Sequence, residues 1–472
     1  MDHSGPAGHA ISERDWRSLA GALPDGGRLF RPGDRGYAST RPVSNQRYAG
    51  VLPGGVAACR GAGDIAAAVA WARDRNLPFA LRSGGHSYAG YSSTTGLLID
   101  LSGLADISVD PAAGEVTVGT GVTQAQLHHA LRRYGRTFPA GRCPTVAMGG
   151  LILGGGIGFS CRMFGLACDS LVRTDLLTAS GEVVRCSPDL HTDLFWACRG
   201  GAGGSFGVNT SFTLRTQVAT RVTLFELSWP LRDARSVLAA VQEIVREAPG
   251  EFGIRADVVT SGSCPEEAAK RAHVRAIGQF LGPRGELERL LAPVLAPAPG
   301  LGCRIRECDY WEAVESFADQ PPVFEFAVKS RMVTGTLPGE AVDLLVAEIT
   351  RWPGSQNEDG ACAALFALGG AVGRVAPDAT AFVHRDAAFI LALETNWTGS
   401  DPRAVSQAGL DWLDRLCAQL APYTADAAYQ NFPDPELKNW RTAYYGTNYG
   451  RLAEVKRAYD PDNIFKFEQS ID

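Results

Sequence analysis

Two reactive side chains stand inside glycine-rich stretches of this sequence. His86 lies in the segment RSGGHS, and Cys143 lies in the segment GRCPTV. Imidazole and thiolate are both nucleophiles, and glycine lets the backbone approach a ligand closely. Taken singly, such a histidine is usually a turn residue and such a cysteine usually packs in the core. No Asp or Asn stands near Cys143 to complete a protease-like relay, so hydrolysis has no support from these residues.

Glycine itself is unusually frequent, at 54 of 472 residues, or about 11% against a usual ~7%. Its clusters between residues 84 and 207 are Gly84-Gly85, Gly149-Gly150, Gly154 to Gly156 and Gly200-Gly201. Several such loops around one ligand favour a large, anionic and partly flat molecule. Backbone N–H groups can bind its pyrophosphate without a basic cluster. The alternative is that these glycines serve only tight packing.

A dinucleotide fingerprint is less well supported. Residues Gly61 to Ala66 fit the pattern GxGxxA and open a helix. That fingerprint requires an acidic residue about 20 positions further on, and no carboxylate follows position 81 until Asp100. A nicotinamide-binding Rossmann domain is therefore not predicted.

Composition limits the classes of partner. The chain has 45 Lys and Arg against 51 Asp and Glu, which leaves a net charge of −6 without a basic block. Neither nucleic acid nor an anionic membrane is expected as the main partner. No apolar run approaches the ~18–20 residues of a membrane-spanning helix, and the first residues do not read as a secretion signal, so we expect a cytoplasmic protein. The eleven cysteines contain no CxxC pair, and no metal site is predicted.

The hydrophobic pattern predicts two kinds of unit. Up to residue 217, the sequence predicts a helix from Asp64, strands at 78–82, 97–101 and 115–120, a helix capped by Thr123, and a hairpin turning at Ser180-Gly181. Between 218 and 429, long apolar strands alternate with helical runs at 234–248 and 339–352. This pattern favours an α+β unit with a sheet covered by helices on one side. The segment 291–300 reads as a surface loop.

Several longer segments closely resemble one family. They are PFALRSGGHSYAGYS (78–92), GLLIDLSGL (96–104), GRCPTVAMGG (141–150), GGGIGFSCRMFGLACDSL (154–171), DLFWACRGGAGGSFGVNTSF (193–212), VHRD (383–386), YQNFPDPEL (429–437) and YYGTNYGRLAEVKRAYDPDNIFKFEQSI (444–471). Through them, the chain resembles the berberine bridge enzyme-like flavoproteins, within the vanillyl-alcohol oxidase type of FAD-linked oxidases. The resemblance implies a two-domain α+β fold. An FAD-binding domain spans 1–217 and 430–472, and an antiparallel-sheet substrate domain flanked by helices spans 218–429.

The same resemblance implies an FAD that is covalently attached twice. His86 matches the histidine that bonds to the ring methyl, and Cys143 matches the cysteine that bonds to the adjacent ring carbon. Such links retain the cofactor while the pocket stays open to a bulky substrate. The further residues expected to contact FAD are Arg82, Ser83, Gly84, Gly85, Ser87, Val146, Gly149, Gly150, Gly154, Gly155, Gly156, Gly158, Gly207, Val208 and Asn448.

Two residues are candidates for the base that removes a proton from the substrate. Tyr429, in YQNF, matches a tyrosine that deprotonates the hydroxyl in sugar- and alcohol-oxidising relatives. A free tyrosine has a pKa of ~10, so keeping it ionised at pH 7 costs about 4 kcal/mol. Lys438, Arg441 or the flavin could lower that cost. Glu394, on the strand that follows VHRD, is the second candidate.

Val146 matches a position where valine in relatives lets dioxygen reach the flavin. Val146 thus favours an oxidase that forms hydrogen peroxide. The expected reaction removes hydride from a CH–OH centre, or as the less favoured alternative a CH–N centre, of a sugar, glycoside or polycyclic natural product. The alternatives are oxidative cyclisation or dehydrogenation on the same flavin, a noncovalently bound flavin, and a non-catalytic metabolite-binding protein. Usage rich in Ala, Arg and Gly is associated with high-GC bacteria, and so with secondary metabolism such as antibiotic biosynthesis.

Overall fold

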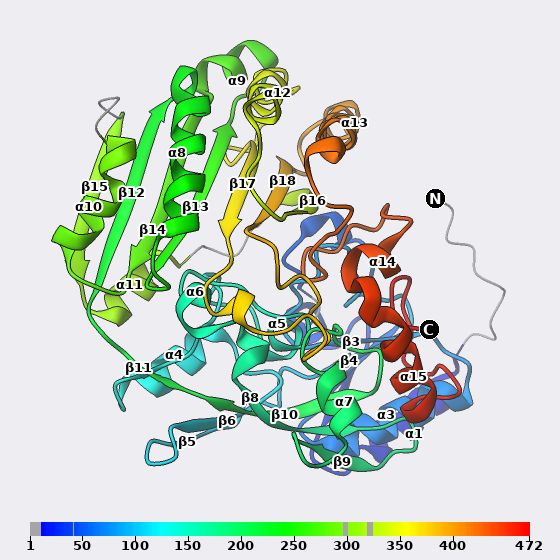
Figure 1. Ribbon diagram of the computed structural model, residues 1–472. Helices are drawn as coiled ribbons and strands as arrows, with labels where there is room; N and C mark the ends of the chain where they lie inside the picture. The colour runs from blue at the N-terminus through cyan, green and yellow to red at the C-terminus, as the bar shows by residue number, and fades with distance from the viewer. Residues whose placement is uncertain (1–10, 41, 296–300, 319–323) are drawn as a thin grey trace.

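The structure is a computed structural model that describes residues 11–40, 42–295, 301–318 and 324–472. Its strands form three larger sheets and a two-stranded ribbon. The seven-stranded sheet and its helices make one half of the molecule, and the other two larger sheets lie with the C-terminal helices in the other half (Figure 1). Within the described residues, no helix is long and apolar enough to cross a membrane.

The four-stranded sheet has the order β1-β2-β4-β3. Its strands are β1 (Arg28–Phe30), β2 (Gly55–Ala58), β3 (Phe79–Arg82) and β4 (Leu97–Asp100). Strand β4 pairs in parallel with both β2 and β3. Helix α3 (Ala62–Asp74) and helix α1 (Glu13–Ala22) pack on this sheet through one apolar cluster. The helix and strands predicted between residues 64 and 101 are confirmed.

The five-stranded sheet is antiparallel, with the order β5-β6-β10-β8-β9. Its strands are β5 (Ile107–Asp110), β6 (Glu115–Gly119), β8 (Leu171–Leu177), β9 (Val183–Cys186) and β10 (Val208–Arg215). The predicted hairpin is β8–β9, and Gly181 takes a φ of +87° in its turn. Thr123 caps helix α4 (Gln124–Arg132) by accepting from the backbone N–H of Gln126, as predicted. The ribbon pairs β7 (Arg136–Thr137) with β11 (Gln217–Val218).

The seven-stranded sheet is antiparallel and has the order β15-β12-β14-β13-β17-β18-β16. Its strands are β12 (Val222–Pro230), β13 (Phe252–Thr260), β14 (His273–Phe280), β15 (Gly302–Cys308), β16 (Glu325–Val333), β17 (Ala361–Ala367) and β18 (Phe389–Trp397). One face packs against α8 (Ala234–Glu247), α10 (Arg284–Leu295), α12 (Gly339–Ile349) and α13 (Arg403–Leu420) in a large apolar cluster. The other face, called here the open face, turns toward the first half of the molecule.

Shorter helices complete the fold. They are α2 (Tyr37–Thr40), α5 (Met148–Leu153), α6 (Cys161–Phe164), α7 (Thr192–Ala197), α9 (Pro265–Arg271), α11 (Tyr310–Ser316), α14 (Trp440–Tyr445) and α15 (Tyr449–Tyr459). Helix α15 joins the tail to the first half, because the buried Lys456 donates to the carbonyls of Ser205 and Phe465 at 2.7 Å and to Asp460 at 2.6 Å. This return of the chain supports the proposed division into 1–217 with 430–472 and 218–429.

The prediction of a surface loop at 291–300 is wrong for residues 291–295. Helix α10 continues to Leu295 and includes Pro293, while residues 296–300 lie outside the described residues. Leu287, Leu291 and Val294 are buried together against the seven-stranded sheet. Burial of this apolar stripe offsets the hydrogen bond that a proline removes from a helix.

Candidate functional site

A cavity of about 1730 Å³ lies between the open face and the glycine-rich loops of the first half. Its wall includes the loop 83–95, the segment 141–151 and strands β13, β14, β16, β17 and β18. Pockets for drug-sized ligands are usually ~300–1,000 Å³. This space is therefore large enough for a cofactor together with a substrate.

His86 and Cys143 both line this wall, and their side chains converge on one hydroxyl. His86 Nε2 lies 2.9 Å from Thr145 Oγ1, and Cys143 Sγ lies 3.4 Å from the same oxygen. Burial lowers the pKa of His86 to about 4, so its imidazole is neutral at pH 7 and keeps a lone pair on one ring nitrogen. Two residues 57 positions apart in sequence thus present nucleophilic atoms to one part of the cavity.

The two loops that carry His86 and Cys143 pack closely against neighbouring segments at their glycine residues. A Cβ on Gly84 would lie 2.7 Å from the backbone nitrogen of Ala147, and a Cβ on Gly149 would lie 2.4 Å from Thr120 Oγ1. Gly150, in contrast, has open space where a Cβ would stand, and it lines the cavity. Glycine therefore serves close packing at Gly84 and Gly149 and leaves room for a ligand at Gly150.

Most of the residues predicted to contact FAD line the cavity. They are Ser83, Gly84, Gly85, His86, Ser87, Cys143, Val146, Gly149, Gly150, Gly158, Gly207 and Val208. Several buried polar atoms of the wall have no hydrogen-bond partner within the described residues, including Tyr91 Oη, Ser92 Oγ, Gln124 Oε1 and Gln430 Oε1. Unpaired buried polar atoms are costly, so these atoms are available to hydrogen-bond to a bound ligand or to water. A polar, flat cofactor such as FAD fits this wall.

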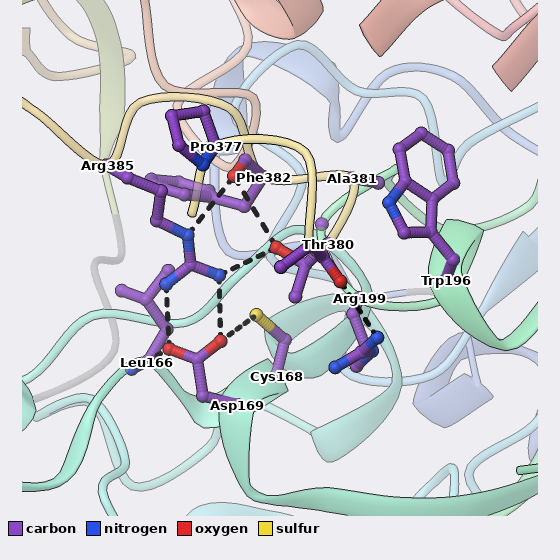
Figure 2. A network of polar contacts seen from close by, with 12 residues as sticks. Leu166, Cys168, Asp169, Trp196, Arg199, Pro377, Thr380, Ala381, Phe382 and Arg385 are labelled. Carbon is purple, nitrogen blue, oxygen red and sulfur yellow. Dashed lines mark hydrogen bonds and ion pairs between the residues drawn. The ribbon is translucent and has the colours of Figure 1, made fainter. Parts of the chain in front are cut away.

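Five of the residues predicted to contact FAD are not among those that line the cavity, and their contacts lie within the protein. The guanidinium of Arg82 donates to the carbonyls of Ser92 and Pro42 and to Ser93 Oγ, so it shapes the loop 83–95. Gly154, Gly155 and Gly156 allow close packing instead, since a Cβ on each would meet Asn431, Phe382 and Ala167, respectively. The buried amide of Asn448 donates to the carbonyls of Pro377 (2.8 Å), Thr380 (3.1 Å) and Ala381 (3.4 Å), residues labelled in Figure 2.

Tyr429 lines the cavity but is 1% exposed. Its hydroxyl accepts hydrogen bonds from the N–H of Gly156 at 2.9 Å and from Asn431 Nδ2 at 3.3 Å. Burial nevertheless raises the pKa of Tyr429 above its usual value. The help expected from Lys438 and Arg441 is absent. Lys438 is 85% exposed beside Glu436, and Arg441 pairs with Asp472.

Glu394 projects from β18 on the open face, where it lines the cavity. Burial raises the pKa of Glu394, and the positive charge of Arg255 partly opposes that shift. A carboxylate with a raised pKa is a suitable general base near neutral pH.

A charged group on the open face was missed by the sequence analysis. Arg255 and Asp257 on β13 and Arg275 on β14 form ion pairs at 2.8 Å, and the Asp257 side chain is fully buried. The strand EFGIRADVV contained a signal for this group. Because side chains alternate between the two faces of a strand, Arg255 and Asp257 share one face, and the apolar Ile254, Ala256 and Val258 lie on the other.

The GxGxxA segment binds no nucleotide phosphate in this fold. The carboxylate of Asp25 accepts from the N–H groups of Gly63 at 2.7 Å and Asp64 at 3.2 Å, at the start of α3. An acidic side chain therefore occupies the position where a pyrophosphate would bind.

Comparisons with known proteins agree with this geometry. The family model "FAD binding domain" matches residues 53–187, and the model "Berberine and berberine like" matches residues 428–472. The uncharacterized FAD-linked oxidoreductase YgaK of Bacillus subtilis is 35% identical over 459 residues, which cover 94% of this chain and 96% of that protein. The monolignol oxidoreductase AtBBE-like 13 of Arabidopsis thaliana is 28% identical and covers 86% of this chain and 81% of its own length.

The fold is similar to solved structures as well. Physcomitrella patens BBE-like 1 superposes with a TM-score of 0.86 at 28% identity, covering 97% of this chain and 98% of that chain. A chitooligosaccharide oxidase shares the fold with a TM-score of 0.84 at 24% identity, covering 97% of this chain and 99% of its own.

Proposed function

The chain belongs to the berberine bridge enzyme-like family of FAD-linked oxidoreductases, and we propose that it oxidises a CH–OH centre with dioxygen as electron acceptor. The substrate class is a sugar, glycoside or polycyclic natural product. One observation carries the proposal: the nucleophilic atoms of His86 and Cys143 meet at Thr145 in a cavity that also contains Glu394.

We propose that His86 and Cys143 both bond covalently to FAD. The neutral imidazole of His86 has a lone pair for one bond, and the sulfur of Cys143 supplies the other. Each bond would replace one hydrogen of FAD and one of the side chain, and the two electrons and two protons released for each bond would pass to dioxygen. The unpartnered polar atoms of the wall would hold FAD by hydrogen bonds.

When bound, FAD would supply a two-electron acceptor for hydride from the substrate carbon, with dioxygen as the final acceptor that forms hydrogen peroxide. The chain must take the hydroxyl proton. Tyr429 and Glu394 both remain candidates for that step, and the direction of their pKa shifts favours Glu394, since burial keeps Tyr429 protonated. Protonated Tyr429 can donate a hydrogen bond to the substrate oxygen, because its own oxygen accepts from Gly156 and Asn431.

The substrate class follows from the two sides of the open face. The strands β16, β17 and β18 present Phe326, Val328, Ala364, Phe366 and Ala392 to the cavity together with Glu394, and β13 and β14 add Arg255 and Arg275. A ring system with a polar substituent matches this division. The name of the Arabidopsis relative, a monolignol oxidoreductase, supports an alcohol as the oxidised group.

Anaerobic mixing of the holoenzyme with sugars, glycosides and polycyclic alcohols tests the proposal. A substrate should bleach the flavin absorbance and yield the carbonyl product, and later admission of air should restore the colour with one hydrogen peroxide per turnover. Cyclised product would favour oxidative cyclisation instead. Binding without bleaching across the panel would favour a non-catalytic flavoprotein.

A further inference from the structure

The hydroxyl of Thr145 lies between the two nucleophiles of the cavity wall. Thr145 Oγ1 is 2.9 Å from His86 Nε2 and 3.4 Å from Cys143 Sγ. Neither the imidazole nor the thiol has another hydrogen-bond partner within the described residues. One hydroxyl therefore contacts both groups that the proposed attachment of FAD requires.

The backbone on both sides of Thr145 is held by the start of helix α4. The carbonyl of Pro144 accepts from the N–H of Ala125 at 2.9 Å, and the carbonyl of Val146 accepts from the N–H of Gln124 at 2.9 Å. The Cα of Thr145 is thereby fixed relative to α4, and a β-branched side chain has few rotamers. The position of the hydroxyl between its two partners is set before any ligand binds.

The hydrogen atoms in this contact can be arranged in two ways. Burial lowers the pKa of His86 to about 4, so the neutral ring has one N–H and one lone pair. The Thr145 hydroxyl has a single hydrogen, so it donates to one neighbour and accepts from the other. If Nε2 donates to Thr145, the hydroxyl donates to Cys143 Sγ, and His86 Nδ1 keeps its lone pair. If the thiol donates to Thr145, the hydroxyl donates to Nε2, and the ring hydrogen is on Nδ1.

The first arrangement alone leaves both groups able to form a bond. His86 Nδ1 then has a free lone pair, and the hydrogen bond to sulfur favours the thiolate, which is the reactive form of a cysteine. In the second arrangement the sulfur keeps its hydrogen, and the hydrogen bond uses the lone pair of Nε2. No Lys or Arg side chain donates to Cys143 Sγ in the part of the chain that the structure describes. The donor that can favour the thiolate is therefore Thr145.

We propose that Thr145 is a positioning residue for the covalent attachment of FAD, since its hydroxyl accepts from His86 Nε2 and donates to Cys143 Sγ and so keeps both nucleophiles in their bonding form. This inference rests on the two covalent bonds proposed above. Each bond replaces one hydrogen of FAD and one of the side chain, and dioxygen takes the two electrons and two protons. For His86 the side-chain hydrogen is the one on Nε2. Thr145 accepts it and releases its own hydrogen to water, which reaches this exposed residue. The hydrogen of Cys143 passes to water when the thiolate forms.

A pulse-chase measurement of covalent FAD in single-link variants tests the proposal. After a short induction, protein synthesis is stopped, and samples denatured in acid at intervals give the covalently linked fraction by intact mass. In His86→Ala the added mass reports the Cys143 bond, and in Cys143→Ala it reports the His86 bond. Adding Thr145→Val to either variant should slow the gain of mass by at least about tenfold, because a hydrogen bond to a reacting group is lost. Adding Thr145→Ser, which keeps the hydroxyl, should restore most of the rate.

Thr117→Val is the matched control. It removes a threonine hydroxyl that lies 2.8 Å from Thr213 Oγ1, outside the cavity wall. This change should leave the rate of both bonds unaltered. The flavin absorbance of each native, purified variant shows separately that the chain folds and binds FAD.

The same gain of mass with and without Thr145→Val, equal slowing by Thr145→Val and Thr145→Ser, or slowing of only one of the two bonds would overturn the proposal. Loss of bound flavin from native Thr145→Val would overturn it as well, because Thr145 would then serve folding or FAD binding. If neither single-link variant gains mass while Thr145 is intact, the covalent attachment proposed above fails. If both gain mass equally fast with valine at this position, only the role of Thr145 fails.

Discussion

Arg385 and Asp169 form a two-point ion pair that joins the loop before β18 to the segment after α6 (Figure 2). Arg385 Nη1 donates to Asp169 Oδ2 at 2.8 Å, and Nη2 donates to Oδ1 at 2.7 Å, across 216 positions of sequence. Arg385 also donates to the carbonyl of Phe382 at 3.2 Å. The Phe382 ring meets Tyr429 edge-on at 6.1 Å. The pair therefore supports the wall of the cavity from outside it.

Asp169→Asn should lower the free energy of unfolding by about 3–5 kcal/mol, because the Arg385 side chain is 1% exposed and would lose its counter-charge. Urea denaturation of the holoprotein measures this loss. The matched control is Asp343→Asn, which breaks an ion pair with more than half of each side chain exposed, and it should cost less than about 1 kcal/mol. Similar effects of the two changes would show that the Arg385 pair is not a structural support.

Glu394→Gln should keep the yellow colour and slow anaerobic flavin reduction by about 10²–10⁴-fold, the usual contribution of a general base. Tyr429→Phe should slow it by only about fivefold, since the substrate oxygen loses one hydrogen bond worth ~1 kcal/mol. Stopped-flow absorbance with the substrate found in the screen gives both rates. The reverse order of the two effects would assign the proton transfer to Tyr429.

The pH dependence of flavin reduction provides an independent check on Glu394. The ionised carboxylate is the active form, so the rate should rise with pH through the Glu394 pKa and level off above it. Burial raises that pKa, so the acidic limb should lie above the ~4.3 of an exposed glutamate. The limb should disappear in Glu394→Gln. An acidic limb that persists unchanged in this variant would belong to another group.

Val146→Leu should slow the reaction of the reduced enzyme with dioxygen by at least about tenfold and leave anaerobic reduction unchanged. Val146 lines the cavity three positions after Cys143, and the added methylene fills the path to the flavin. Reduction with dithionite followed by mixing with aerated buffer measures this step alone. Val51→Leu, on another part of the wall, is the control. Equal rates of reoxidation by dioxygen in Val146→Leu and in the unchanged protein would show that Val146 does not control the access of oxygen to the flavin.

Local signals in the sequence were sufficient for several elements. Thr123 before an amphipathic run predicted the cap of α4, and Ser180-Gly181 between two strands predicted the hairpin turn, because both depend on neighbouring residues alone. The continuation of α10 past Pro293 could not be predicted in this way. It depends on burial against a sheet whose strands are distant in sequence.

The residues of the cavity wall could likewise be assigned only in part from the sequence. The motif around His86 and Cys143 identified both loops, but it could not distinguish glycines that face a ligand, such as Gly150, from glycines that pack against side chains, such as Gly154. That difference depends on Asn431, which follows 277 positions later. The ion pairs of Asp257 likewise required the register of β13 against β14. The sequence analysis missed residues, such as Asp257, whose role depends on a distant partner.

The central claim is that His86 and Cys143 both bond to FAD, and intact-mass spectrometry of the freshly purified, denatured protein tests it most directly. The unchanged protein should carry the added mass of one FAD after unfolding. His86→Ala and Cys143→Ala should each still carry it through the remaining link, and the double variant should lose it. A polypeptide that shows no added mass once unfolded would contradict the account, and loss of the mass in either single variant would reduce the two links to one.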